Sequence, residues 1–418
     1  IQSSGPIPSS TRFVRGGRCG VHVRSSRSER NHDTGGIQRM NLLSFVHPIR
    51  TYQPCSGVGR HANNMLLRLA QRDGLRQALF FSEQWLGDDG EMDPRTPLRK
   101  LPAHTFPHPE NLTERCWKIA GRPRMDRWVP DETDLLYAPV ETYLPVEKCP
   151  VAVTIHDIQA FETELPWSQT WAHRWFRLKW STWIYDTLRD CEVVFTVSAF
   201  SKSRMVELLG ADPEDIVVVG NGVDARFFEV AEQPREKVER PCEAPYLFMI
   251  GGLRAKKGGD AMLAVARELE RQGSDVQLVV AGPNGPEYEA QADDLDNVHL
   301  LGWVDDEDVP RLMRGALALL FLSPYEGFGL PAAEAMAAGT PAIVADRASL
   351  PEVVGDAGIV LEPGETERIV DHVRSLRHDT SRRRQYVEAG RERAQHYTWD
   401  RCVDRLVETF AAITAGRE

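Results

Sequence analysis

The sequence predicts an α/β fold with two domains, each built on a mainly parallel sheet. Short apolar runs of strand length alternate with helical apolar periodicity along both halves of the chain. Glycine-containing turns follow several of these runs, as in doubly wound sheets. A charged segment with two prolines, residues 231–243, interrupts the alternation and is predicted to be the linker between the domains.

Composition limits the classes of protein that fit. The 418 residues suffice for two domains with full cores, and 42% hydrophobic and 27% charged residues are typical of a globular protein. A net charge of -11 without a long basic stripe argues against a nucleic-acid-binding protein. The seven cysteines are scattered, with no CxxC pair and no cluster at zinc spacing, so we expect reduced thiols in a cytoplasmic protein. The sequence has no apolar run of about 18 residues that would span a membrane.

The first 39 residues differ from the rest of the chain. They are rich in Ser, Gly and Arg and show hardly any apolar periodicity. Because such a segment cannot bury a core, residues 1–39 are expected to be a disordered tail, and the folded protein is expected to begin at Met40. The segment lacks the apolar stretch of a secretory signal, and an organellar transit peptide is the alternative.

The predicted N-terminal domain covers residues 40–230. Its strands are predicted at 41–46, 78–81, 135–138, 151–155, 192–197 and 216–219, and residues 86–127 are predicted to be irregular. Gly57 and Gly59 are predicted to form a tight turn before a helix, either as a structural turn or as a ligand contact. His156 follows the strand at 151–155, where ligands collect in open α/β sheets, although a structural or solvated histidine is the alternative.

Residues 167–190 carry Trp167, Trp171, Trp175 and Leu178 at helical spacing. We expect them to form a long core helix with an amphipathic face. The alternative is a surface at the inner face of the membrane that contacts a lipid-linked substrate, because aromatic and basic residues combine in such surfaces.

The predicted C-terminal domain covers residues 244–395. Its strands are predicted at 246–250, 276–280, 298–301, 316–322 and 341–345. The last segment, residues 396–418, is predicted to be a helix with an apolar face that packs back toward the N-terminal domain.

The run SPYEGFGLPAAEAMAAG, residues 323–339, carries the strongest chemical signal. It follows an apolar strand and leads into a helix, with Gly327 and Gly329 in the turn and Glu326 and Glu334 on either side of it. Free N–H groups at a helix N-terminus attract an anion, and a carboxylate just inside the helix suits the hydroxyls of a ribose or sugar. The pattern therefore predicts a nucleotide-sugar site.

A second candidate is the loop of residues 251–259, which contains Arg254, Lys256 and Lys257. Fixed cations and backbone donors before a helix can bind a diphosphate. Basic residues on a surface turn are often only solvated, but this loop follows a strand in the same domain as the glutamate motif. We therefore expect both to face one site.

With these motifs the chain resembles the retaining GT-B glycosyltransferases of the family that includes bacterial mannosyltransferases and relatives of glycogen and sucrose synthases. The mark of that family is a pair of glutamates separated by seven residues, here Glu326 and Glu334. The likeness extends to LGWVDDEDVPRLMRGA, VGNGVD, TVSAFSKS, TIHD and SGVGRH, and so to almost all of the chain beyond Met40. It implies a GT-B fold, in which two Rossmann-like domains face each other across a cleft.

The resemblance also implies roles for the residues that match the family's motifs. Glu334 would hold the ribose hydroxyls of the donor, and Glu326 would contact the transferred sugar. The backbone of the turn would lie against the sugar and diphosphate, at Gly327, Phe328, Gly329 and Leu330. His156 would line the catalytic cleft.

The phosphate-binding positions include one departure from the family. Lys257 matches the phosphate-binding lysine, but Gly252 or Lys256 stands where an arginine is usual, and Arg254 lies between them. Lys256 is expected to substitute for that arginine with one less bidentate contact. From the other domain, Gly57 and Gly59 would approach the diphosphate.

The implied reaction moves a hexosyl group, such as mannosyl, from a GDP- or UDP-linked donor to a hydroxyl of a glycan, a lipid-linked or a small-molecule acceptor. Retention by front-side attack, with the leaving phosphate as base, is the working hypothesis. Cations and a helix N-terminus would stabilise the leaving group, so no metal or other cofactor is expected. The alternatives are a catalytically silent nucleotide-sugar-binding protein and a nucleotide-dependent oxidoreductase, although G-x-G-x-x-G does not directly follow the first strand.

Overall fold

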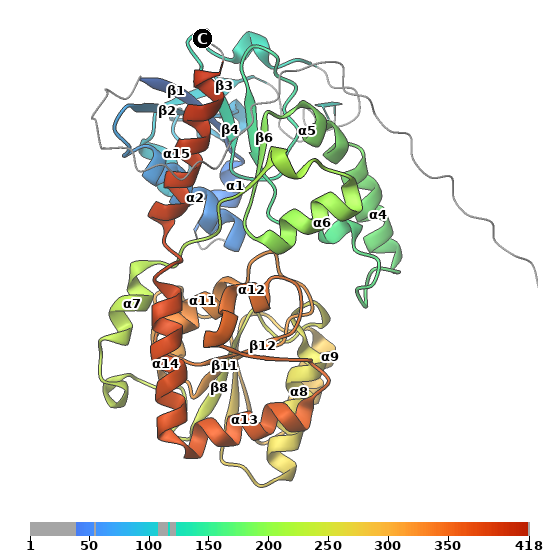
Figure 1. Cartoon of the computed structure of the whole chain (residues 1–418), viewed down its shortest axis with the longest axis vertical. Coiled ribbons are helices and arrows are strands. Elements are labelled where there is room, and N and C mark those ends of the chain that lie inside the picture. The colour runs from blue at the N-terminus through green and yellow to red at the C-terminus, as the bar shows by residue number, and fades with distance from the viewer. Residues whose placement is uncertain (1–38, 54–55, 108–115, 118–122, 417–418) are drawn as a thin grey trace, which may run out of the picture.

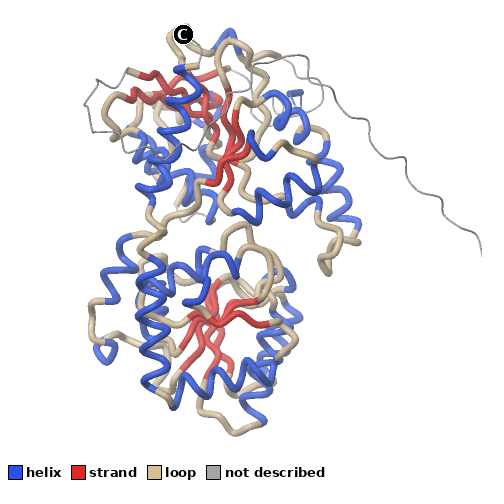
Figure 2. Tube along the Cα trace, in the orientation of Figure 1, coloured by secondary structure: helices blue, strands red, loops and turns tan. Residues whose placement is uncertain are grey.

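The computed structural model describes residues 39–53, 56–107, 116–117 and 123–416. The tail expected at 1–39, apart from Arg39, lies outside the described residues, as do Cys19 and Cys55. Two α/β domains follow one another along the long axis of the molecule (Figure 1). In each domain helices cover a central sheet (Figure 2).

The N-terminal domain contains a sheet of seven parallel strands in the order β3-β2-β1-β4-β5-β6-β7. The strands are β1 (Met40–Phe45), β2 (Leu75–Ser82), β3 (Ala103–Phe106), β4 (Leu135–Ala138), β5 (Val151–Thr154), β6 (Val193–Thr196) and β7 (Ile216–Val218). β1 pairs with β2 on one side and β4 on the other, so the strand order reverses there. The region 86–127, predicted to be irregular, contains β3. Only Phe106 of this edge strand is buried, so its sequence lacks the usual apolar pattern.

The helices of this domain are α1 (Pro48–Thr51), α2 (Gly57–Leu69), α4 (Trp171–Ser181), α5 (Ile184–Asp190) and α6 (Ala199–Leu209). Gly57 and Gly59 lie in the first turn of α2, so the tight turn predicted for them is wrong. The helix begins at this point because Ser56 caps it, accepting a hydrogen bond from the Gly59 N–H at 3.4 Å.

Residues 167–190 do not form one core helix, and that prediction is wrong. The chain breaks into α4 and α5 around Trp183, and His173 is the only buried residue of α4. Trp171 and Trp175 are 83% and 70% exposed. The part of the aromatic stripe that lies on α4 faces solvent rather than the core, whereas Trp167, before the helix, is buried.

The C-terminal domain contains a sheet of six parallel strands in the order β10-β9-β8-β11-β12-β13. Its strands are β8 (Tyr246–Ile250), β9 (Gln277–Ala281), β10 (Val298–Gly302), β11 (Ala318–Phe321), β12 (Ala342–Ala345) and β13 (Ile359–Leu361). The helices are α7 (Ala225–Ala231), α8 (Gly259–Arg271), α9 (Pro286–Asp293), α10 (Val309–Gly315), α11 (Leu330–Ala337), α12 (Leu350–Val354), α13 (Thr366–His378) and α14 (Thr380–Ala394). Here the strand order reverses at β8, which lies between β9 and β11.

The chain passes between the domains twice, and the two passages touch. The first passage precedes α7, which packs in the core of the C-terminal domain, so it lies ahead of the linker expected at 231–243. The Val223 N–H donates to the Tyr397 carbonyl at 2.9 Å, and Trp399 Nε1 donates to Asp224 Oδ1 at 2.8 Å. A Cβ on Gly222 would lie 2.3 Å from the Trp399 nitrogen, so only glycine permits this approach.

The last helix, α15 (Trp399–Ala415), lies against the N-terminal domain (Figure 1). Its apolar face is buried in one cluster with the inner face of α2, through Met65, Leu66, Leu69, Cys402, Val403, Leu406 and Phe410. Burial of this stripe ties the end of the chain to the first domain.

Candidate functional site

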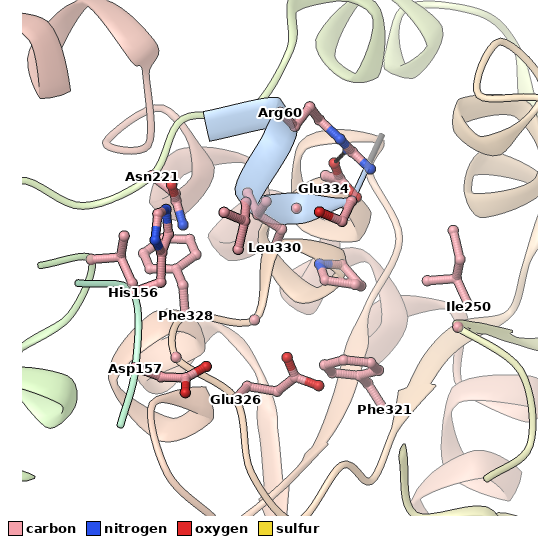
Figure 3. A pocket seen from close by; sticks show the side chains of 18 of the residues that line it. Arg60, His156, Asp157, Asn221, Ile250, Phe321, Glu326, Phe328, Leu330 and Glu334 are labelled. Atoms are coloured by element: carbon pink, nitrogen blue, oxygen red, sulfur yellow. Dashed lines mark hydrogen bonds and ion pairs between the residues drawn. The ribbon is translucent and has the colours of Figure 1, made fainter. Parts of the chain in front are cut away.

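A cavity of about 320 Å³ lies between the two domains (Figure 3). Its volume falls at the lower end of the roughly 300–1,000 Å³ range of ligand pockets. The start of α2 and the segment after β5 line it from the N-terminal domain, and the segments after β8 and β11 line it from the C-terminal domain. Each sheet therefore presents the carboxyl ends of strands at its switch point, where ligands bind in open α/β sheets.

The turn of the glutamate motif brings backbone from the two domains into contact. Gly329 adopts φ +97°, a left-handed conformation that favours glycine, directly before α11. A Cβ on Gly327 would lie 2.6 Å from the His156 carbonyl oxygen, and the Gly327 carbonyl accepts from Ser198 Oγ at 2.6 Å. The two glycines shape the turn so that Phe328 and Leu330 also reach the cavity lining.

The two glutamates of the motif are ion-paired with cations that come from different domains. Lys257 Nζ lies 2.7 Å from Glu326 Oε1. Arg60, on α2, donates from Nη1 to Glu334 Oε1, and Figure 3 shows it directed toward that carboxylate. Burial raises the pKa of Glu334, and the charge of Arg60 opposes this effect. The motif is therefore neutralised from both sides of the cavity.

The loop after β8 delivers one of its basic side chains to the cavity. Lys257 lines it, whereas Arg254 and Lys256 are not among the described lining residues. Arg254 Nε donates to the Pro283 carbonyl at 2.8 Å, and Lys256 Nζ lies 5.6 Å from the ring centroid of Trp167.

The glycine positions predicted to contact the donor differ in their placement. Gly57 lines the cavity, whereas Gly59 and Gly252 are not among the described lining residues. Gly252 has φ +74°, and a Cβ there would lie 1.9 Å from the Pro283 carbonyl, so no side chain fits. Its N–H donates to the Ala281 carbonyl at 3.0 Å, within the fold of the loop.

His156 is buried at the cavity wall and is held by a carboxylate. Its backbone N–H and its Nδ1 both lie 3.0 Å from Glu141 Oε1. Burial alone would raise the pKa of Glu141, but the charge and hydrogen bond of His156 hold it at about 2. His156 Nε2 has no hydrogen-bond partner among the described residues, so this nitrogen can serve a ligand.

A second histidine packs behind the first. The rings of His61 and His156 are nearly perpendicular, with centroids 4.7 Å apart. Burial, with the charge of His156, lowers the pKa of His61 to about 3, so its ring is neutral at physiological pH. Because the amide oxygen of Asn221 can only accept, His61 Nδ1 donates to Asn221 Oδ1 at 2.7 Å, which joins α2 to the passage between domains.

Asp157 also lines the cavity, and the pKa of its carboxyl group is raised toward neutral pH. Burial raises its pKa to about 6, with further contributions from Glu141 and Glu326, while a hydrogen bond from the Gln159 N–H opposes the rise. The folded-state pKa thus exceeds the ordinary value of 3.8. The stability that Asp157 contributes is therefore fully present below about pH 4 and is lost as the pH rises through about 6.

We predict that Asp157→Asn stabilises the protein above pH 6, because the amide carries no buried charge. The gain is about 1–3 kcal/mol at pH 8 and absent at pH 4, since one pKa unit corresponds to about 1.4 kcal/mol. Thermal unfolding from pH 4 to 8 measures it, with the exposed Asp73→Asn as the control. A gain that does not depend on pH would contradict the assignment.

Several residues of this site were not among the predicted site residues. Arg60 and His61 belong to the SGVGRH stretch, Asn221 to VGNGVD and Asp157 to TIHD, so the motifs already contained the signal. Glu141 lies outside every motif, and only the fold brings it to His156.

In the described part of the chain, no group of three or more His, Cys, Asp or Glu side chains could hold a metal ion. No described helix is long and apolar enough to cross a membrane.

Two parallel-sheet domains that face each other across a cavity lined by paired glutamates define the GT-B class of glycosyltransferases. The family model "Glycosyltransferase Family 4" matches residues 55–227, and "Glycosyl transferases group 1" matches residues 230–393. The chain therefore belongs to the group 1 glycosyltransferases of the family 4 type, and it is an enzyme of that class.

Relatives and solved structures agree with this assignment. The O-antigen chain mannosyltransferase B of Escherichia coli is 25% identical over 394 residues, which cover 90% of this chain and 100% of that protein. The MMP alpha-(1->4)-mannosyltransferase of Mycolicibacterium hassiacum is 28% identical over 326 residues, covering 74% of this chain and 76% of the relative. Among structures, Anabaena HepE in complex with UDP and glucose has a TM-score of 0.63 at 18% identity, over 89% of this chain and 100% of that one. Likeness at this identity concerns the fold, and it confirms the predicted GT-B architecture.

Proposed function

We propose that this glycosyltransferase moves a mannosyl group from a nucleotide-diphosphate sugar to a hydroxyl group of a glycan or lipid-linked acceptor, with retention of the anomeric configuration. The observation that carries the proposal is the pairing of Glu326 with Lys257 and of Glu334 with Arg60 around one cavity. Two carboxylates can accept hydrogen bonds from sugar and ribose hydroxyls, while the cations suit a diphosphate between them.

The donor proposed first is GDP-mannose, and a UDP-linked sugar is second. The two mannosyltransferase relatives favour mannose. The structure similar to this chain that contains UDP and glucose supports the second choice, at the level of the fold. The site also carries the neutral His61 and a His156 whose Nε2 is available to a sugar hydroxyl.

Charge determines the mechanism that we propose. The bond between the anomeric carbon and the diphosphate oxygen breaks, and the acceptor hydroxyl oxygen forms the new bond on the same face. The hydroxyl proton passes to the leaving diphosphate. Lys257 and the N-terminus of α11 stabilise the negative charge on the leaving group, and Glu326 stabilises the positive charge on the sugar.

The proposal is tested with a panel of GDP- and UDP-linked sugars, together with NAD(P)H. A donor that binds only the folded state must raise the melting temperature, and transfer or hydrolysis must release the nucleoside diphosphate. We expect GDP-mannose to give both signals, and NMR of the product to show the α configuration of the donor. Binding without diphosphate release would indicate the silent binding protein, and a response to NAD(P)H alone would indicate an oxidoreductase.

We further propose that the exposed face of α4 contacts an anionic lipid surface, where a lipid-linked acceptor would lie. Trp171, Trp175 and Leu178 are 83%, 70% and 57% exposed. Arg174 lies over the Trp171 ring, 5.2 Å from its centroid, so cations accompany the aromatic residues. Such aromatic and basic faces bind the boundary between headgroups and acyl chains. The contact of Lys256 with Trp167, just before α4, connects this face to the loop beside the cavity.

The variant Trp171→Ser/Trp175→Ser is expected to bind anionic vesicles roughly tenfold more weakly, because two apolar anchors are lost. Co-sedimentation with vesicles of phosphatidylglycerol and phosphatidylcholine measures this effect. The matched control is Trp303→Ser, since Trp303 is 64% exposed but lies in the C-terminal domain. Equal loss in the control, or no vesicle binding by the wild type, would contradict the proposed membrane contact.

A further inference from the structure

The permanent positive charges at the cavity come from both domains. Among the described lining residues, the arginine and lysine side chains are Arg60, from α2, and Lys257, from the loop after β8. Their side chains are 20% and 35% exposed, so both are partly withdrawn from water. Electrostatic interactions with a bound anion are stronger in such a setting than at an open surface.

One ammonium group is a poor match for a diphosphate. The group carries several negative charges on separate oxygen atoms, whereas Lys257 offers a single point charge. The two other basic residues of its loop are engaged elsewhere, Arg254 with the Pro283 carbonyl and Lys256 over Trp167. A guanidinium group, in contrast, can bind two phosphate oxygens at once.

Arg60 is placed to supply that guanidinium. It lies in the first turn of α2, whose start lines the cavity through Ser56, Gly57 and Val58. The N-terminus of this 13-residue helix carries a partial positive charge that adds to the charge of Arg60. The N-terminus of α11 lines the same cavity from the other domain, through Leu330 and Pro331.

In this structure Arg60 is paired with the buried Glu334. Burying a carboxylate without a partner costs free energy. Glu334 therefore stays paired with Arg60 until another hydrogen-bond donor replaces the arginine. The hydroxyl groups of a ribose are such donors.

We propose that Arg60 is a donor-binding residue that contacts the diphosphate from the N-terminal domain, and that Glu334 holds it until the donor arrives. The inference rests on the proposed function, because it needs a nucleotide-diphosphate donor in this cavity. When the ribose hydroxyls donate to Glu334, Arg60 exchanges the carboxylate for phosphate oxygens. The exchange leaves Glu334 hydrogen-bonded and Arg60 paired with phosphate, and it couples recognition of the ribose to that of the diphosphate.

The test compares a nucleoside diphosphate with its monophosphate, GDP with GMP or UDP with UMP, by calorimetric titration of the full chain. The quantity measured is the ratio of the two dissociation constants. In Arg60→Gln we expect the preference for the diphosphate to fall about tenfold, and in Arg60→Lys to fall less, because charge is kept and the bidentate contact is lost. Arg68→Gln, on the same helix but paired with Asn64 and outside the described cavity lining, should keep the wild-type ratio.

Each of the other possible outcomes would overturn either the role of Arg60 or the proposed function. Equal weakening of both ligands in the Arg60 variants would mean that Arg60 only orients Glu334, and it would overturn the inference. Unchanged affinities would overturn it as well. If Arg60→Gln does not fold, an unchanged ratio in Arg60→Lys serves the same purpose. A wild-type protein that binds neither diphosphate would instead overturn the proposed function, and the inference with it.

Discussion

Replacing Glu326 with glutamine is expected to remove sugar transfer while nucleotide binding and the fold are kept. The carboxylate lies 2.7 Å from Lys257 and is 15% exposed, so its charge acts in a poorly screened position. Glutamine keeps the shape and the ability to accept a hydrogen bond, but it cannot stabilise positive charge on the sugar. We therefore expect the rate of transfer to fall roughly 10²–10³-fold.

The rate of diphosphate release from the preferred donor measures this loss, and calorimetric titration with the free nucleoside diphosphate measures binding. The matched control is Glu268→Gln, because Glu268 is also ion-paired but belongs to a surface pair on α8. Full turnover by Glu326→Gln would overturn the role assigned to this glutamate. A fall in nucleotide affinity equal to the fall in rate would place Glu326 at the nucleotide instead.

Lys257→Gln is expected to lower both the rate of transfer and the affinity for the diphosphate. Lys257 is the basic residue of its loop that lines the cavity, and its charge stabilises the leaving group as the bond to the sugar breaks. Because the interaction strengthens in the transition state, kcat/KM should fall roughly 10²–10³-fold, more than the affinity for the diphosphate product.

Steady-state kinetics and product-inhibition constants separate the two effects. The exposed Lys237→Gln provides a control of the same chemistry, since Lys237 lies outside the described cavity lining. If Lys257→Gln changed only the affinity for the donor, its contribution would be to binding rather than to catalysis. Wild-type kinetics would remove Lys257 from the site.

The parallel α/β architecture could be predicted from the sequence because buried parallel strands are short apolar runs. β4 and β8 begin and end at the residues that were predicted for them, 135–138 and 246–250. β3 could not be found in this way, because three of its four residues are not buried. The sequence also could not show whether the aromatic stripe of α4 is buried or exposed. Helical spacing places residues on one face of a helix but does not show whether that face packs against the core.

At the site, the glutamate motif and Lys257 could be located because the chemistry follows directly from local sequence. The pairing of Arg60 with Glu334 spans 274 positions, so it depends on how the domains meet rather than on any local pattern. The need for glycine at position 252 could not be predicted from local sequence either. The Pro283 carbonyl, which belongs to another loop, leaves no space for a side chain there. The placement of Arg254 and Lys256 away from the cavity likewise depends on packing with Pro283 and Trp167.

The two touching passages between the domains have a mechanical consequence. The two segments that connect the domains are held side by side by the Val223–Tyr397 and Trp399–Asp224 hydrogen bonds. Together they form one hinge region between the domains. We expect such paired connections to favour rotation of the domains about one axis over twisting or sliding. Motion of this kind would widen or narrow the cavity while preserving which residues oppose one another. Gly222 permits the close approach of the two connections, because a side chain there would collide with Trp399.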